Sequence, residues 1–307
     1  MTIFNNDEAI KFFRDNGYPV EYNDGLLAWL KDYFGVTTGA LADLVGRYRR
    51  EQGLNFQSAF NPTSLFAASE KGVWYDPSDF STLFQDTAGT TPVTATGQLV
   101  ARMNDKSGNG KHMTQATSAA RPVIEQDANG KYYLNFDGID DAMVSTETLF
   151  FSSTNNVSFF AGIRKMGDAS IGVLFELGPS QATIGSFTMT APSAALLNVS
   201  AGYRGLSAAR TAAITNASPS TSVLVVTANL ATPRIRIRRN GGAFVETTNS
   251  TGGGNFADAI GYLGARAGNA NLFVGRVYGV IFRGKTSTDA EITSAENYMI
   301  GKTQADA

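Results

Sequence analysis

Three aspartates that follow an alternating segment form the densest acidic cluster of the chain. Asp137, Asp140 and Asp141 lie within five positions, directly after residues 131–136. Carboxylate oxygens on a loop are hard ligands, which Ca²⁺ prefers. Alternatively, Asp137-Gly138 makes a turn in which the acids accept hydrogen bonds from backbone N–H groups. The cluster therefore predicts a turn, with calcium as the one cofactor that the sequence leaves open.

Three arginines alternate with isoleucines in the segment Arg234-Ile235-Arg236-Ile237-Arg238. In an extended strand successive side chains point to opposite faces, so the three arginines share one face. A row of guanidinium groups suits an anionic glycan or the carboxylates of a neighbouring subunit. The alternative is a solvated outer face that discourages edge-to-edge pairing of strands.

Aromatic side chains supply a second kind of ligand chemistry, because flat rings stack on the apolar faces of sugars. Six residues could supply such a surface: Trp74, Tyr75, Tyr132, Tyr133, Tyr203 and Tyr262. Trp74 and Tyr262 are the two retained as candidate binding residues. Half or more of the tryptophan and tyrosine side chains of the chain are expected in the core instead.

The composition excludes several classes of catalytic and metal site. The 307 residues include no cysteine and one histidine, His112, which lies in a polar, glycine-bearing loop. Thiolate nucleophiles, zinc fingers and iron–sulfur clusters are therefore excluded, and His112 is expected to make a structural hydrogen bond. A net charge of −2 argues against nucleic-acid binding, and no apolar run is long enough to cross a membrane.

The elements that must position these residues change character along the chain. Residues 57–307 predict about ten short strands with glycine turns, and a final helix at 288–302 that opens with a capping-box pattern. This pattern predicts an antiparallel sandwich. The predicted strands are 131–136, 157–163, 173–177, 184–190, 195–203, 222–229, 234–238, 244–247, 259–263 and 272–282.

Residues 1–56 predict a separate helical module instead. Units of about 17–18 residues each begin at an aspartate, continue as a short helix with an apolar face, and end at Gly17, Gly35 or Gly53. Such short helices are marginal alone and must pack on each other or on a partner. We therefore expect either a small packed helical domain or an attachment and oligomerisation module, whose apolar contacts are Phe12, Phe13, Trp29, Leu30 and Phe34.

Several segments together resemble the concanavalin A-like, laminin-G-like jelly-roll superfamily over roughly residues 65–302. The segments, in order, are Trp74 to Asp79, Asp105 to Gln115, Tyr133 to Asp141, Gly261 to Gly264, Phe273 to Phe282, and Asp289 to Ile292. The first two resemble a bacterial and phage subgroup that is frequent in virion proteins of tailed bacteriophages. The resemblance implies a concanavalin A-like antiparallel jelly roll, a fold that lectins, glycosidases and structural domains share.

The resemblance also bears on activity. Glycosidases of the superfamily carry a Glu-x-Asp-x-x-Glu strand motif, which is absent here, and Glu176 stands alone in its strand. We therefore expect a non-enzymatic structural protein of a phage virion, of the tail-fibre, receptor-binding or head-decoration type. A free lectin and a polysaccharide-degrading enzyme are the alternatives.

The expected partners and location follow from that resemblance. They are other virion proteins, further copies of the same chain as a homotrimer, and a host-surface glycan. A cysteine-free chain with no signal-peptide pattern suits assembly in the host cytoplasm.

Overall fold

The structure is a computed structural model that describes residues 28, 30–32, 37 and 60–305. The chain divides into two compact units, residues 1–60 and 61–307. The helical module predicted for residues 1–56 lies almost entirely outside the described residues, as do Phe12, Phe13, Trp29 and Phe34. Leu30 is described, and it is helical and buried. The attachment role of this module stays a prediction.

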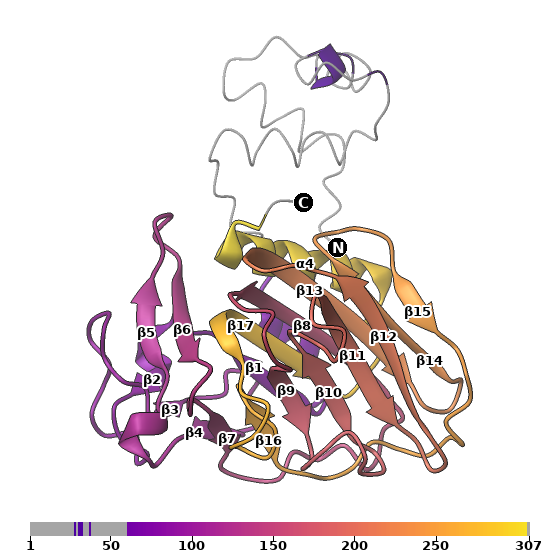
Figure 1. Ribbon diagram of the computed structural model, residues 1–307, viewed down its shortest axis with the longest axis horizontal. Coiled ribbons are helices and arrows are strands. Elements are labelled where there is room, and N and C mark those ends of the chain that lie inside the picture. Colours follow the sequence, from indigo (N-terminus) through magenta and orange to yellow (C-terminus); the bar gives the residue numbers. More distant parts are fainter. Residues whose placement is uncertain (1–27, 29, 33–36, 38–59, 306–307) are drawn as a thin grey trace. The chain divides into compact units, whose positions relative to one another are not determined.

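Two antiparallel sheets make up the second unit (Figure 1). Sheet A has eight strands, in the order β15 (Val245–Thr247), β14 (Arg234–Arg239), β13 (Ser220–Asn229), β8 (Asn156–Lys165), β17 (Val274–Arg283), β6 (Tyr132–Asp137) and β5 (Val123–Gln126), with β1 (Gly72–Tyr75) also paired to β17. Sheet B has nine, in the order β12 (Ala209–Thr215), β11 (Asn198–Arg204), β10 (Phe187–Thr190), β9 (Val173–Leu177), β16 (Gly261–Leu263), β7 (Met143–Ser145), β4 (Met113–Thr114), β3 (Arg102–Met103) and β2 (Leu83–Phe84).

The predicted mainly β sandwich with a C-terminal helix is confirmed. The helix α4 spans Asp289–Thr303 and begins with the predicted capping box of Thr288 and Glu291. Three short 3₁₀ helices complete the described elements: η1 (Pro62–Phe66), η2 (Phe80–Thr82) and η3 (Ser118–Ala120). Among the described residues, no helix combines the length and apolar character that crossing a membrane requires.

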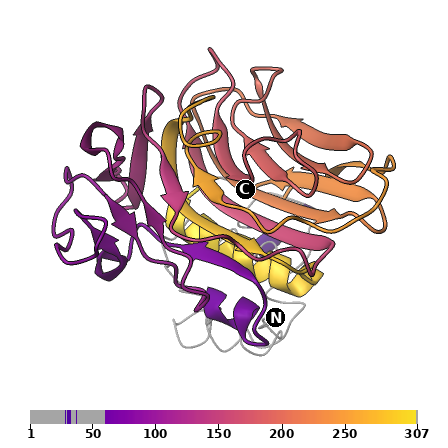
Figure 2. The same ribbon diagram turned by 90° about the horizontal axis from the view of Figure 1, so that it is seen from below.

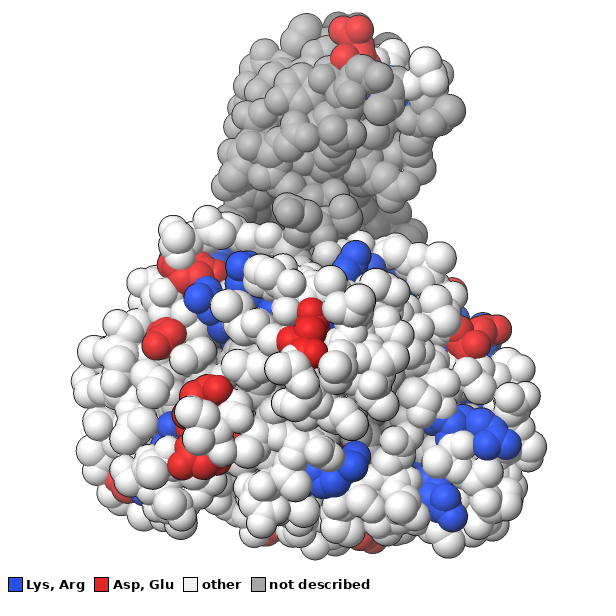
Figure 3. Space-filling view, viewed as in Figure 1, with Lys and Arg blue, Asp and Glu red and all other residues white. Residues whose placement is uncertain are grey.

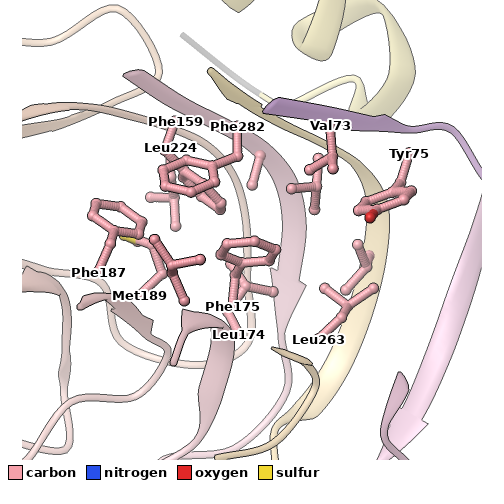
Figure 4. Close-up of a cluster of buried hydrophobic side chains, with 14 of the residues drawn as sticks. Val73, Tyr75, Phe159, Leu174, Phe175, Phe187, Met189, Leu224, Leu263 and Phe282 are labelled. Atoms are coloured by element: carbon pink, nitrogen blue, oxygen red, sulfur yellow. The ribbon is translucent and has the colours of Figure 1, made fainter. Parts of the chain in front are cut away.

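Aromatic rings from both sheets meet in the core (Figure 4). Phe159 of β8 and Phe282 of β17 come from sheet A, whereas Phe175 of β9 and Phe187 of β10 come from sheet B. The ring centroids of Phe187 and Phe282 lie 4.9 Å apart, and those of Phe175 and Phe282 lie 5.2 Å apart. Because alternate residues of each strand point into this layer, the residues between them form the outer faces of the sheets.

Helix α4 covers part of the outer face of sheet A, against β8, β13 and β17 (Figure 2). The middle of these three ten-residue strands is buried on both sides for this reason. Gly162 of β8 allows the close approach, since a Cβ there would lie 2.5 Å from Cγ2 of Thr303. The helix therefore hides the central rows of sheet A and leaves other rows open.

Candidate functional site

One cross-strand row on the outer face of sheet B contains the predicted sugar-stacking residue Tyr262. Tyr262 of β16 pairs with Val144 of β7 on one side and with Glu176 of β9 on the other. The row continues through Thr188 of β10 to Gly202 of β11. The neighbours of Glu176 along its strand, Phe175 and Leu177, belong to the core, so Glu176 points outward.

Glu176 is buried although it lies on an outer face, and two side chains hold its carboxylate. Arg266, in the connection between β16 and β17, lies 3.2 Å from Oε1 as an ion pair, and Thr188 donates its hydroxyl to Oε1 over 2.9 Å. Burial raises the pKa of Glu176, and the Arg266 guanidinium opposes that shift. The Arg266 guanidinium, whose side chain is 28% exposed, is therefore held on the carboxylate of Glu176, the register partner of Tyr262.

Connections between strands close one half of this row. Gln181 lies directly over Gly202, where any side chain would overlap it, and it donates through Nε2 to the hydroxyl of Thr211 over 3.0 Å. Glu176, Thr188 and Gly202 are therefore buried, whereas Val144 and Tyr262 are partly exposed. The accessible part of the face thus combines an aromatic ring with a fixed cation.

The acidic cluster begins at Asp137, the last residue of β6, and continues into the connection to β7. Asp137 Oδ1 accepts from the backbone N–H of Ile139 over 2.7 Å, and Asp141 Oδ2 accepts from that of Asp137 over 2.9 Å. The predicted capping role is therefore confirmed. The ligand atoms of Asp137, Asp140 and Asp141 also lie within 4.8 Å of one another, a spacing that suits a metal ion. Burial raises the pKa of Asp141 to about 6, with further contributions from the other two charges.

The three arginines of β14 share the outer face of sheet A, as predicted, while Ile235 and Ile237 are fully buried. Each arginine has an acidic neighbour within the chain. Arg234 pairs with Glu246 at 2.6 Å, Arg238 pairs with Glu296 of α4 at 2.6 Å, and Arg236 lies 3.9 Å from Asp289. Arg236 and Arg238 also lie over the ring of Phe244. The face is solvated at Arg234, whose side chain is 49% exposed, and largely covered at Arg236 and Arg238, whose side chains are each 18% exposed.

Trp74 lies far from this chemistry, in sheet A. It is buried, with Lys106 Nζ 4.4 Å from its ring centroid and Tyr298 of α4 at its edge. Its backbone N–H donates to Asp105 Oδ1 over 2.9 Å. Trp74 therefore packs between sheet A, the 105–112 segment and α4, and the structure does not bring it together with Tyr262.

His112 makes the predicted structural hydrogen bond. Its Nδ1 accepts from the backbone N–H of Asp105 over 3.1 Å. Burial and the neighbouring Arg102 lower the pKa of His112, so the ring is neutral near pH 7. The Asp105 carboxylate also accepts from the N–H groups of Ser107 and Lys111, and the turn between them places Gly108 and Gly110 at positive φ.

Sequence reasoning missed Arg266 as a partner of this site. It is 90 positions from Glu176 and lies in a glycine-rich connection. No local spacing links the two residues, because their contact depends on β16 pairing with β9.

The charge on the visible face is sparse. In Figure 3 acidic and basic side chains form small separate groups on a mostly uncharged surface. Among the described residues on that face, no continuous basic surface of the kind that follows a nucleic-acid backbone occurs.

Comparison with solved structures shows a likeness in fold. The binding domain of botulinum neurotoxin serotype D matches with a TM-score of 0.50 and 10% identity, over 76% of this chain and 52% of that one. The structure described as HCR/D-Sa-GBL1/C also matches with a TM-score of 0.50 and 10% identity, over 75% of this chain and 52% of that one. A Ruminococcus gnavus IT-sialidase CBM40 bound to α2,6-sialyllactose matches with a TM-score of 0.38 and 13% identity, over 47% of this chain and 84% of that one.

These identities show the fold alone, and the match covers about half the length of each of the first two structures. No protein-family model and no curated protein sequence matches the chain.

Proposed function

We propose that the sandwich is a non-catalytic carbohydrate-binding domain whose ligand lies on the outer face of sheet B at Tyr262. The observation that carries this proposal is the partly exposed Tyr262 ring, whose register partner Glu176 is buried and holds the Arg266 guanidinium in place. A tyrosine ring offers an apolar face to a sugar, and its hydroxyl and the guanidinium offer polar contacts to sugar hydroxyls. The ion pair with Glu176 holds the Arg266 guanidinium in place before a ligand binds, so little side-chain entropy is lost on binding.

Binding of the full chain to a glycan array tests the proposal. Tyr262→Ala is expected to weaken binding of each neutral glycan that the array identifies about tenfold or more, since it removes the stacking surface, whereas Tyr262→Phe retains most of the affinity. Phe150→Ala is the matched control, because it removes a half-exposed ring elsewhere on the sandwich. Equal binding by Tyr262→Ala and the unmodified chain would refute the proposed face.

A polysaccharide-degrading enzyme is the second candidate, because one observation favours it. The pKa of Glu176 is raised, as in the general acids of glycosidases. The pairing of that carboxylate with Arg266 and its complete burial favour binding instead. Incubation with host polysaccharide distinguishes the two: oligosaccharide release that Glu176→Gln abolishes would establish the enzyme, and no release at high protein concentration supports the binding domain.

The finer proposal is that the chain is a structural protein of a tailed-phage virion, with residues 1–56 attaching the sandwich to the particle. The sequence resemblance and the separate N-terminal unit support it. The proposed partners are other virion proteins, further copies of the chain as a homotrimer, and a host-surface glycan. Deleting residues 1–56 is expected to abolish incorporation into particles, and normal incorporation of the truncated chain would refute the attachment role.

A further inference from the structure

Two arginines lie opposite each other on the outer face of sheet A. Arg164 of β8 and Arg276 of β17 are register partners in the antiparallel pair. The row continues to Thr221 of β13 on one side and to Asn135 of β6 on the other. We call these four residues the arginine row. Its members are all partly exposed, and it spans three strand spacings, about 14 Å.

Helix α4 does not cover the arginine row. The helix residues Met299 and Thr303 pack over Gly162 and Gly279, which form the neighbouring outward-facing pair on the same two strands. One step further along each strand, the row is open to solvent. The outer face of sheet A therefore combines a buried helix-covered part with an exposed polar part.

The two arginines lack the carboxylate partners that other arginines of this sheet have. Arg234, Arg238 and Arg283 each pair with a glutamate within 3.0 Å. Within residues 60–305 no carboxylate lies within ion-pair distance of Arg164 or Arg276. Like charges that face each other across two strands are destabilising. An anionic ligand group placed between the two guanidiniums would offset that repulsion.

Neighbouring groups hold both guanidiniums and leave donors free. Arg164 donates to the hydroxyl of Thr221 over 2.9 Å, and the Arg276 guanidinium lies 4.5 Å from the ring centroid of Tyr133. The hydroxyl of Tyr133 in turn donates to Glu125 over 2.9 Å, which fixes the ring. Each guanidinium has five N–H donors in a planar fork, so both retain donors that match a carboxylate or sulfate group.

We infer that the arginine row binds the carboxylate or sulfate groups of an acidic polysaccharide. The inference rests on the proposed carbohydrate-binding function and adds a second contact surface on the opposite sheet. The amide of Asn135 and the hydroxyl of Thr221, at the two ends of the row, are suited to sugar hydroxyls that flank the acidic group. The net charge of −2 favours such a local contact over long-range attraction of a nucleic acid.

Binding of the full chain to alginate, dextran sulfate and neutral dextran tests the inference. Arg164→Gln and Arg276→Gln are each expected to weaken binding to an acidic polymer about tenfold, and the unmodified chain loses affinity as salt rises. Arg239→Gln is the matched control, since it removes one positive charge from the same sheet outside the row. Unchanged affinity in both row variants, or equal affinity for dextran and the acidic polymers, would overturn the inference.

Thermal unfolding separates a binding role from a structural one. Arg164→Gln is expected to leave the melting temperature unchanged or to raise it, because it removes a like-charge contact and keeps an amide near Thr221. A lower melting temperature together with weaker binding would assign the row to structure instead.

Two further measurements distinguish this inference from the proposed function. Tyr262→Ala should weaken the binding of neutral glycans, whereas the arginine-row variants should leave that binding unchanged. If no glycan of any charge binds, both the proposed function and the inference about the arginine row are wrong. Single-stranded DNA is the competing polyanion. If it binds as tightly as alginate, with the same dependence on Arg164 and Arg276, the polysaccharide assignment is wrong.

Discussion

Glu176 shows how one buried residue controls the candidate face. Its carboxylate is fully buried, and Arg266 supplies the compensating charge. Because burial raises the pKa of Glu176 in the folded state, the folded protein holds its proton to higher pH than the unfolded chain. The contribution of this group to stability is therefore complete at low pH and is lost as the pH rises through the raised pKa.

Arg266→Gln is expected to destabilise the protein by about 3 kcal/mol at neutral pH, because it leaves a buried charge without its partner. The loss should shrink as the pH falls and Glu176 becomes protonated. Denaturant unfolding at pH 7 and pH 5 measures both effects. The double variant Glu176→Gln with Arg266→Gln is the control, and a destabilisation by Arg266→Gln that does not depend on pH would contradict this account.

Asp140 decides between the two interpretations of the acidic cluster. Backbone N–H groups use Asp137 and Asp141 as acceptors, so Asp140→Asn leaves the turn intact while it removes the negative charge of one of the three carboxylates. If the cluster binds calcium, a free calcium concentration of 100 times Kd raises the free energy of unfolding by about 2.7 kcal/mol. Asp140→Asn is expected to remove most of that gain.

The pH dependence of this effect has a definite sign. Calcium binds the deprotonated carboxylates, and the pKa of Asp141 is raised to about 6. The stabilisation by calcium should therefore be larger at pH 7.5 than at pH 5. Calorimetric unfolding at each pH, with millimolar calcium and with a chelator, measures this stabilisation. Identical melting temperatures with calcium and with the chelator would leave the turn as the only role of the cluster.

At the scale of elements, local patterns identified the long strands and the final helix. The segment 173–177 is β9 as predicted, and α4 begins at the predicted cap. The strand β12 was not predicted, because its small residues include no alternating apolar pattern. The two-residue strands β2, β3 and β4 were also missed, since they exist only through pairing with distant partners.

Gly162 tests how closely α4 packs on sheet A. Gly162→Ala is expected to destabilise the sandwich by about 1–3 kcal/mol, because the added methyl overlaps the buried, stiff side chain of Thr303. Gly301→Ala is the matched control within α4. Among the described residues, no atom outside the neighbouring helix backbone lies within 4 Å of its added Cβ, so this variant should stabilise by about 0.5–1 kcal/mol through helix propensity. Urea unfolding compares the two, and a neutral Gly162→Ala would mean that the helix can move away from the sheet.

At the scale of the whole molecule, the second unit contains the entire core of both sheets. Residues 61–307 alone are therefore expected to unfold in one cooperative transition and to retain the glycan affinity of the full chain. Thermal circular dichroism and glycan binding of this fragment check the expectation. A fragment with a non-cooperative melt would show that the sandwich depends on residues 1–60.

The sequence by itself determined the alternation, turns and caps, and therefore the sandwich and its helix, because these signals act between residues close in the chain. It also placed Ile235 and Ile237 inward and the arginines between them outward. Only the tertiary structure decided what those outward residues meet. Strand order and register bring Arg266 to Glu176, α4 to Arg238, and Arg276 to Arg164. These contacts depend on pairing between distant segments, which no local spacing encodes.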